Sequence, residues 1–255
     1  STMFAYVHIQ LNSSFITTSK NSNRKSPVRN RGAFRVMAIK EITSVFPKHR
    51  NQKRAEGAAK YMKYVAPFLG IQTKDRRQML WKIFDQLPDP TSKELGETAL
   101  ALMALPEREY HYAAYDLVDY FLEFADEKLL KNYGEKLLTT KSWWDTVDGF
   151  GTSMVSPLTI KYPNKALMTK WINSKNIWLN RAAIQHQRGR KNQTEIQYVI
   201  SLCQKHAKSK EFFITKAIGW ALRDISRIDK AAVRAFLTKN PDLDSVALRE
   251  AKKYL

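Results

Sequence analysis

Four short segments of this chain lead into an aromatic residue in a similar way. They are Leu105-Pro106-Glu107-Arg108-Glu109-Tyr110, Thr140-Lys141-Ser142-Trp143-Trp144, Ser174-Lys175-Asn176-Ile177-Trp178 and Ser209-Lys210-Glu211-Phe212-Phe213. The anchor aromatics Tyr110, Trp144, Trp178 and Phe213 are separated by 34, 34 and 35 residues. A fifth phase of the same pattern falls near Val246 and Ala247. A fixed period of this length indicates stacked two-helix repeats, unless helices of similar length coincide by chance.

The sequence around these anchors favours helices from about Phe34 to the end of the chain. Gly and Pro are few, no stretch alternates like a strand, and proline punctuates the pattern at Pro88-Asp89-Pro90, Pro106, Pro163 and Pro241. We therefore expect an all-α solenoid of HEAT- or TPR-like helix pairs over residues 34–255, with a curved surface on one side.

The first 40 residues contain no Asp or Glu but seven Lys or Arg, and 11–30 is rich in Ser, Thr and Asn. We treat 1–33 as a separate basic leader. It has three interpretations that the sequence leaves open: a transit peptide, a disordered arm that touches DNA, or a remnant of cloning.

The charge balance points to an acidic partner. The chain has 43 Lys and Arg against 24 Asp and Glu, a net charge of +19. Nucleic acid is the first candidate, because each neutralised phosphate releases a counterion. A single cysteine and scattered histidines argue against a disulfide or a metal site, and no apolar run is long enough to span a bilayer. The histidines are His8, His49, His111, His186 and His206.

The segment 213–227 contains an apolar stripe with helical spacing: Ile214, Ala217, Ile218, Ala221, Leu222 and Ile225. Trp220 lies off this stripe, on the same side as Lys216, Arg223 and Arg227. A large aromatic on a basic helix face is either a binding residue or a cap over the edge of the core, and the helical wheel supports both equally.

The segment 142–149 reads as a helix start in which Ser142 caps and Asp145 completes a Ser-x-x-Asp pattern. Trp144 and Asp148 form an i, i+4 pair, which places an indole face beside a carboxylate. An ordinary surface aspartate is the alternative for Asp148.

In 178–188, Leu179, Ala182, Ala183 and His186 are expected to face the core. Arg181, Gln185 and Arg188 gather on the outer face. Arg181 and Lys216 each follow their anchor aromatic by three residues. Equivalent repeat positions line up along a solenoid, so we expect these cations to line one concave groove that holds a phosphate backbone. A solvated basic face is the alternative.

At these residues the sequence resembles the AlkD family of DNA alkylation-repair glycosylases. The resemblance runs from about Phe34 to the C-terminus. Its marks are 58–63 (AAKYMK), 68–73 (FLGIQT), 75–78 (DRRQ), 105–109 (LPERE), 141–148 (KSWWDTVD), 176–178 (NIW), 181–184 (RAAI), 210–213 (KEFF) and 217–220 (AIGW). The basic leader has no counterpart in the family. The chain also ends earlier, so we expect a terminal capping helix to be short or absent.

The resemblance implies a right-handed solenoid of HEAT-like helix pairs that cradles duplex DNA. Asp148 corresponds to the family's catalytic carboxylate, and Trp144 and Trp220 to the two tryptophans that flank the lesion's deoxyribose. Arg181 corresponds to the arginine that grips the nearby phosphate. Further backbone contacts fall at Tyr61, Thr73, Arg77 and Arg223.

We therefore expect a monofunctional DNA N-glycosylase that removes cationic alkylated bases, such as N3-methyladenine or N7-methylguanine, from duplex DNA in base excision repair. It should stabilise an oxocarbenium-like sugar without flipping the base. We expect a monomer without cofactor or metal. It should lie inside the cell with its DNA, in the cytoplasm or nucleoid if the protein is bacterial, and in an organelle or the nucleus if the leader is a targeting segment. The alternatives are a non-catalytic relative that binds bent or branched DNA and a HEAT scaffold for an acidic peptide.

Overall fold

The structure, a computed structural model, describes residues 33–255, and that part of the chain is helical with no strand. The predicted all-α class is confirmed. The predicted leader, 1–33, lies outside the described residues except for Ala33.

The elements are α1 (Ala33–Val45), η1 (Phe46–His49), α2 (Gln52–Tyr61), α3 (Thr73–Phe84), α4 (Ser92–Ala104), α5 (Arg108–Tyr120), η2 (Leu122–Phe124), α6 (Glu127–Leu129), η3 (Leu130–Gly134), α7 (Glu135–Thr139), α8 (Trp144–Phe150), η4 (Gly151–Val155), α9 (Ser156–Lys161), α10 (Lys165–Ile172), α11 (Ile177–Gln185), η5 (Lys191–Gln193), α12 (Ile196–Lys205), α13 (Phe212–Ser226), α14 (Lys230–Lys239), α15 (Ser245–Ala251) and η6 (Lys252–Tyr254).

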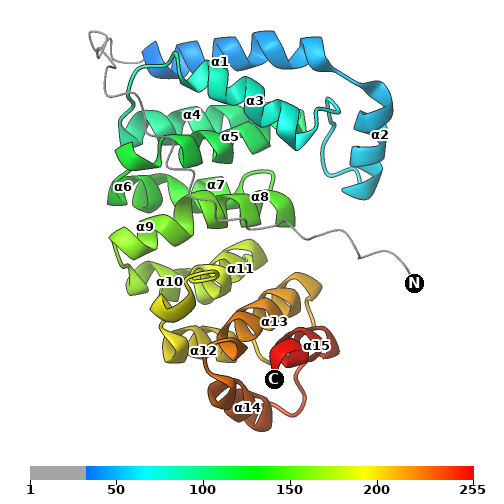
Figure 1. The fold of residues 1–255 in the computed structure, drawn as a ribbon, viewed down its shortest axis with the longest axis vertical. Coiled ribbons are helices and arrows are strands. Elements are labelled where there is room, and N and C mark those ends of the chain that lie inside the picture. The colour runs from blue at the N-terminus through cyan, green and yellow to red at the C-terminus, as the bar shows by residue number, and fades with distance from the viewer. Residues whose placement is uncertain (1–32) are drawn as a thin grey trace.

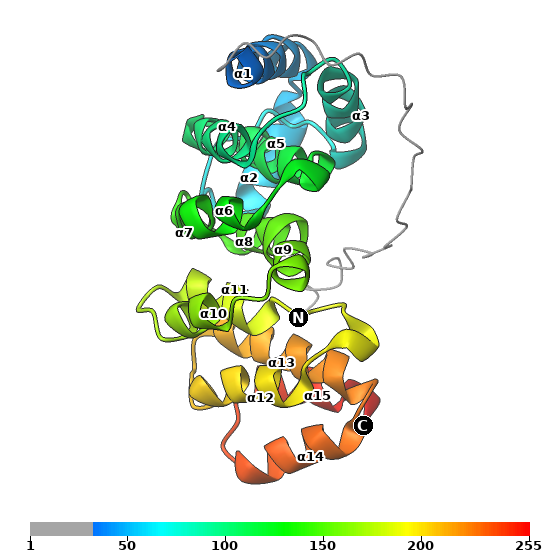
Figure 2. The ribbon, with the colours of Figure 1, turned by 90° about the vertical axis from the view of Figure 1, so that its left-hand side faces the viewer.

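The helices stack along the long axis of the molecule, from α1 at one end to α14 at the other (Figures 1 and 2). Helices α5, α8, α11, α13 and α15 each contact the next, and we call this row the front layer. A second row covers it, with α4 on α5, α10 on α11, and α12 on α13. This arrangement of stacked helix pairs is an α-solenoid.

The repeat period recurs in the hydrogen bonds of the second row. His206 Nε2 lies 2.7 Å from the carbonyl oxygen of Ile172, 34 residues earlier. The side-chain amides of Gln204 and Asn240, 36 residues apart, exchange two hydrogen bonds. Contacts between residues one period apart are expected when each repeat packs only on its neighbours.

Local sequence determines where several of these helices begin. Asn164, Asn176, Glu211, Asp229 and Asp244 each accept a backbone N–H at the start of α10, α11, α13, α14 and α15. Such side chains satisfy amide groups that have no partner within the helix. The repeat boundaries are therefore encoded locally, before any tertiary contact forms.

One continuous cluster of buried apolar side chains extends from Phe34 to Ala251. The predicted stripe of α13 is confirmed, since all six of its residues are buried. Leu179, Ala182, Ala183 and His186 are buried as expected. The stacked helix pairs thus share one main core.

The anchor position of the second repeat differs from the prediction. Trp143, not Trp144, packs with the next two anchors, its ring centroid lying 5.6 Å from that of Trp178 and 4.9 Å from that of Phe213. Assigning Trp144 to the anchor row was wrong by one residue. Trp144 is consequently left out of the aromatic cluster and is partly exposed.

Helix α2 lies at the side of the stack and packs through a small core of its own (Figure 1). Ala55, Ala59, Met62 and Phe68 form this core against Tyr112, Trp143 and Trp144. Helix α2 is therefore attached to the front layer at the positions of α5 and α8. Among residues 33–255, none of the helices combines the length and apolar character needed to cross a membrane.

Candidate active site

Ion pairs connect successive helices of the front layer. Arg108 of α5 pairs with Asp145 of α8, at 2.6 Å. Arg181 of α11 pairs with Asp148 of α8, at 2.7 Å. Glu250 of α15 binds both Lys216 and Arg223 of α13. Helix α8 thus presents two carboxylates, one toward each neighbouring repeat.

The carboxylate of Asp148 is fixed by three hydrogen bonds. Arg181 donates Nε to Oδ1 at 2.8 Å and Nη2 to Oδ2 at 2.7 Å, and Gln185 donates Nε2 to Oδ1 at 3.2 Å. The side chain remains 15% exposed. Oδ2 accepts only one of these bonds, so it retains a lone pair for a further partner. Asp148 is therefore an oriented anion that solvent still reaches.

Arg181 lies in the interior, and its predicted position on the outer face was wrong. The residue is 1% exposed. Besides its two bonds to Asp148, its Nη1 donates to the carbonyl oxygen of Phe213 at 2.6 Å. Its guanidinium connects α8, α11 and α13, which is a structural position rather than one open to a phosphate.

Trp220 is surrounded by cations. The guanidinium carbons of Arg188 and Arg181 lie 4.4 and 5.2 Å from its ring centroid, and Lys216 Nζ lies 5.6 Å away. Trp220 is partly exposed, as its place off the apolar stripe predicted. Since Arg181 bonds to Asp148, the ring and the carboxylate share one neighbour. An indole face attracts cations, and at Trp220 three side-chain cations of the protein already lie around the ring.

Asp145 is also held by buried partners, and the predicted capping role is wrong. Ser142 donates its hydroxyl to the carbonyl oxygen of Leu138 instead of capping α8. Asp145 accepts two bonds from Arg108 and one from Tyr112, at 2.7 Å. Burial and the nearby Asp145 charge raise the pKa of Tyr112. Tyr112 thus remains a neutral hydrogen-bond donor, and Asp145 joins α8 to α5.

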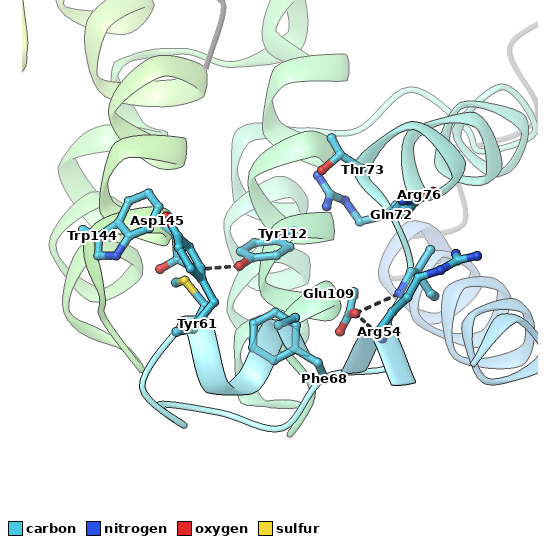
Figure 3. A pocket seen from close by; sticks show the side chains of 14 residues that line it. Arg54, Tyr61, Phe68, Gln72, Thr73, Arg76, Glu109, Tyr112, Trp144 and Asp145 are labelled. Carbon is cyan, nitrogen blue, oxygen red and sulfur yellow. Dashed lines mark hydrogen bonds between the residues drawn. The ribbon is translucent and has the colours of Figure 1, made fainter. Parts of the chain in front are cut away.

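A cleft of about 550 Å³ opens between α2, α3, α5 and α8 (Figure 3). Tyr61, Thr73 and Trp144, three residues predicted to contact DNA or the lesion, lie on its wall together with Tyr112. Tyr61 is 55% exposed. Asp148 follows Trp144 by one helical turn on α8, so the two residues share a face of that helix, although Asp148 does not itself line the cleft.

The two remaining predicted contacts, Arg77 and Arg223, are both bound to carboxylates. Arg77 donates Nε to Asp116 at 3.0 Å and is half exposed. Arg223 donates to Glu250 at 3.0 Å and is mostly covered. Burial alone would raise the pKa of Glu250, but Lys216 and Arg223 outweigh burial and lower it. Arg77 is the more accessible of the two cations.

Sequence reasoning missed the residue that holds one wall of the cleft. Glu109 is buried, and its carboxylate accepts the backbone N–H groups of Leu69, Gly70 and Ile71 at 2.7 to 3.1 Å. Gly70 adopts a φ of +85°, and a Cβ there would lie 2.2 Å from the carbonyl oxygen of Asn51. The hydrogen bonds of Glu109 join residues about 40 positions apart, a separation for which the sequence pattern carries no signal.

The described residues contain no group of three or more His, Cys, Asp or Glu side chains arranged to hold a metal ion. The candidate site consists of the fixed carboxylate of Asp148, the partly exposed indole rings of Trp144 and Trp220, and several cations, all carried by a solenoid of helix pairs.

Comparison with known proteins defines the family. A sequence model described as DNA alkylation repair enzyme matches residues 42–255. A solved structure, titled as a predicted DNA alkylation repair enzyme from Enterococcus faecalis, superposes with a TM-score of 0.74 at 25% identity, covering 81% of this chain and 97% of the other. No functionally curated protein matches significantly. The chain belongs to the DNA alkylation repair enzyme family, and its role lies in the repair of alkylated DNA.

Proposed function

We propose that the protein is a DNA glycosylase that removes cationic alkylated bases, of the N3-methyladenine and N7-methylguanine type, from duplex DNA. The observation that carries this proposal is the Asp148 carboxylate, which three hydrogen bonds fix, which remains partly exposed, and whose partner Arg181 also lies against Trp220. A preorganised anion is the group that an N-glycosidic cleavage requires.

Cleavage of an N-glycosidic bond develops positive charge on the deoxyribose. Asp148 stabilises that charge electrostatically, and its free Oδ2 lone pair orients the attacking water. The indole faces of Trp144 and Trp220 each add about 0.5 to 2 kcal/mol of cation–π attraction. We assign these three residues as the catalytic residues.

The leaving base needs no proton when it is already cationic, because it departs as a neutral molecule. A general acid is therefore unnecessary, and the proposed substrate class is limited to bases that carry a positive charge. We extend the proposal to catalysis at the sugar without a base-flipping pocket, as the family resemblance implies.

We assign the DNA contacts to four residues, of which Tyr61, Thr73 and Arg77 are exposed and Arg223 is mostly covered. Tyr61 and Thr73 of the cleft, with Arg77 and Arg223, hold the duplex backbone, and the protein acts as a monomer. Arg181 receives a different role from the one that the resemblance implied. We propose that it positions Asp148, because all of its bonds are directed into the protein.

The test is release of N7-methylguanine from methylated duplex DNA by the wild type and by Asp148→Asn. We expect at least a hundredfold slower release for the variant. The matched control is Asp242→Asn, an exposed aspartate in the loop before α15, which should release base like the wild type. Duplex binding and the melting temperature are measured in parallel, so that loss of folding is distinguished from loss of chemistry.

Equal rates for the wild type and Asp148→Asn would refute the assignment of the carboxylate. If the folded wild type binds duplex DNA but releases no cationic base at saturating protein, the protein is instead a non-catalytic binder of distorted DNA.

A further inference from the structure

Arg188 lies in the turn that follows α11, where it stacks against Trp220. Its guanidinium carbon is 4.4 Å from the ring centroid, nearer than Arg181 or Lys216. The residue is partly buried, so its charge lies at the edge of the protein beside the indole and is not fully solvated. Arg188 therefore belongs to the candidate site, but the proposed base-release mechanism gives it no role.

The three cations around Trp220 differ in their partners. Arg181 forms an ion pair with Asp148, and Lys216 forms one with Glu250. Arg188 donates Nη1 to the amide oxygen of Gln185 at 3.0 Å. Among residues 33–255 it has no carboxylate within ion-pair distance. Arg188 is therefore the cation around Trp220 that lacks an ion-pair partner in this part of the chain.

The charged groups around Arg188 do not neutralise its positive charge. Burial lowers the pKa of its guanidinium, Asp148 and Asp224 act against that shift, and Arg223 and Arg181 reinforce it. Of these two carboxylates, Asp148 is bound by Arg181 and Asp224 accepts the backbone N–H of Gly189 at 3.3 Å. Arginine remains a cation in proteins, so the charge persists. A partly buried cation without a counterion is costly.

We propose that Arg188 is the phosphate-binding residue of this site, which pairs with a DNA backbone phosphate next to the deoxyribose held by Trp220. This inference rests on the proposed function for the position of the sugar. A planar guanidinium binds phosphate through two N–H groups, and its stacking on the indole keeps that fork oriented. Gln185 links Arg188 to Asp148, since its amide contacts both. Binding of the phosphate is thereby connected to the catalytic carboxylate.

The experiment measures affinity for a duplex that contains a tetrahydrofuran abasic site, which cannot be turned over. Arg188→Gln, Arg188→Lys and the wild type are compared across a salt series, with melting temperatures for each. The matched control is Arg234→Gln, an exposed arginine on α14. We expect Arg188→Gln to bind about tenfold more weakly, and the slope of log Kd against log salt to fall by about 0.9. Arg188→Lys should keep the slope, and Arg234→Gln should match the wild type.

A second arm identifies the phosphate itself. A neutral methylphosphonate replaces one backbone phosphate at a time on each side of the abasic site. At one position the wild type should lose about tenfold in affinity, whereas Arg188→Gln should lose nothing further. That coupling is absent if the arginine only packs on Trp220.

The proposal is overturned if Arg188→Gln binds with the affinity and salt slope of the wild type. It is also overturned if weaker binding appears only together with a lower melting temperature, since Arg188 would then be a structural cap. Binding to the abasic duplex requires no base release, so a failed excision assay leaves this result interpretable.

Discussion

The pair formed by Asp148 and Arg181 shows how one interaction serves both the fold and the proposed chemistry. Arg181 is almost completely enclosed, while Asp148 keeps contact with solvent. Taking an arginine out of water costs several kcal/mol, which its two bonds to Asp148 and one to Phe213 offset. The buried guanidinium is stabilised by its ion pair with Asp148, and this pairing fixes the carboxylate. The Asp148 side chain therefore needs little further ordering when a substrate binds.

The asymmetry of this pair leads to a prediction about stability. Asp148→Ala should lower the free energy of unfolding by about 3 to 5 kcal/mol, because it leaves Arg181 charged and buried without its partner. The double variant Asp148→Ala/Arg181→Met should be more stable than Asp148→Ala alone, since the enclosed charge has gone. Urea unfolding of the wild type, Asp148→Ala, Arg181→Met and the double variant measures both effects. Strictly additive losses would show that the two side chains are not coupled.

At the scale of elements, α8 is the helix whose position decides the site, because it carries Trp144, Asp145 and Asp148. It approaches α5 closely at Gly149, where a Cβ would lie 2.4 Å from Cδ1 of Tyr115. The glycine follows Asp148 directly in sequence. Any displacement of α8 at this contact moves the carboxylate away from Arg181.

Gly149→Ala should therefore destabilise the protein by about 1 to 3 kcal/mol, through overpacking against Tyr115. It should also reduce base release, because α8 shifts. Gly151→Ala is the matched control, since an added Cβ there meets nothing within 4 Å and the residue has a helical φ of −54°. Thermal unfolding and release of N7-methylguanine measure the two effects. A Gly149→Ala variant as stable and active as Gly151→Ala would contradict this account.

The connection between α2 and α3 is a second element that depends on one residue. Glu109 holds three successive backbone N–H groups of this connection, just before Gln72 and Thr73. Glu109→Gln removes charge and acceptor capacity, and should lower the free energy of unfolding by about 1 to 3 kcal/mol.

The same variant should lose amide hydrogen-exchange protection at residues 69–71, and its affinity for duplex DNA should fall. Glu107→Gln is the control. Its carboxylate pairs with the half-exposed Arg50, and such surface pairs contribute about 0 to 1 kcal/mol. Unchanged exchange at residues 69–71 would indicate that the connection is held by other contacts.

At the scale of the whole molecule, a net charge of +19 coexists with a front layer whose carboxylates are mostly paired. The acidic side chains of this layer form ion pairs with cations of neighbouring helices. They therefore do little to repel a phosphate backbone. We expect cations without such partners, Arg188 among them, to dominate the contact of this surface with DNA.

Stability of the whole molecule should depend on pH through two buried histidines. Burial lowers the pKa of His111 and of His186 to about 4, against 6.5 in an unfolded chain. Between these values the unfolded chain binds more protons than the folded protein. Stability is therefore complete above about pH 6.5 and falls as pH is lowered toward 4, by up to about 3 kcal/mol for each histidine.

Urea unfolding at pH 5, 6 and 7, combined with NMR titration of the histidine rings, measures this dependence. If His111 and His186 titrate near 6.5 while the protein is folded, the proposed origin of the acid sensitivity is wrong.

The helices, their repeat period and the buried stripe of α13 could be predicted from the residue pattern, because helix caps and apolar spacing act within one helix. The pattern also placed Trp220 outside that stripe. These features need no knowledge of neighbouring helices, and they suffice to predict an α-solenoid.

Which side chains of the front layer are enclosed depends on how neighbouring helices pack, and the residue pattern does not contain this information. A helical wheel separates two faces, but a helix in the middle of a solenoid has a neighbour on each side. Arg181 therefore seemed exposed and is buried between α8 and α13, and Trp143 takes the anchor position expected of Trp144. Asp145 and Glu109 find their partners about 40 residues away. The carboxylate predicted for chemistry was found by resemblance, whereas its partners follow from how consecutive repeats pack.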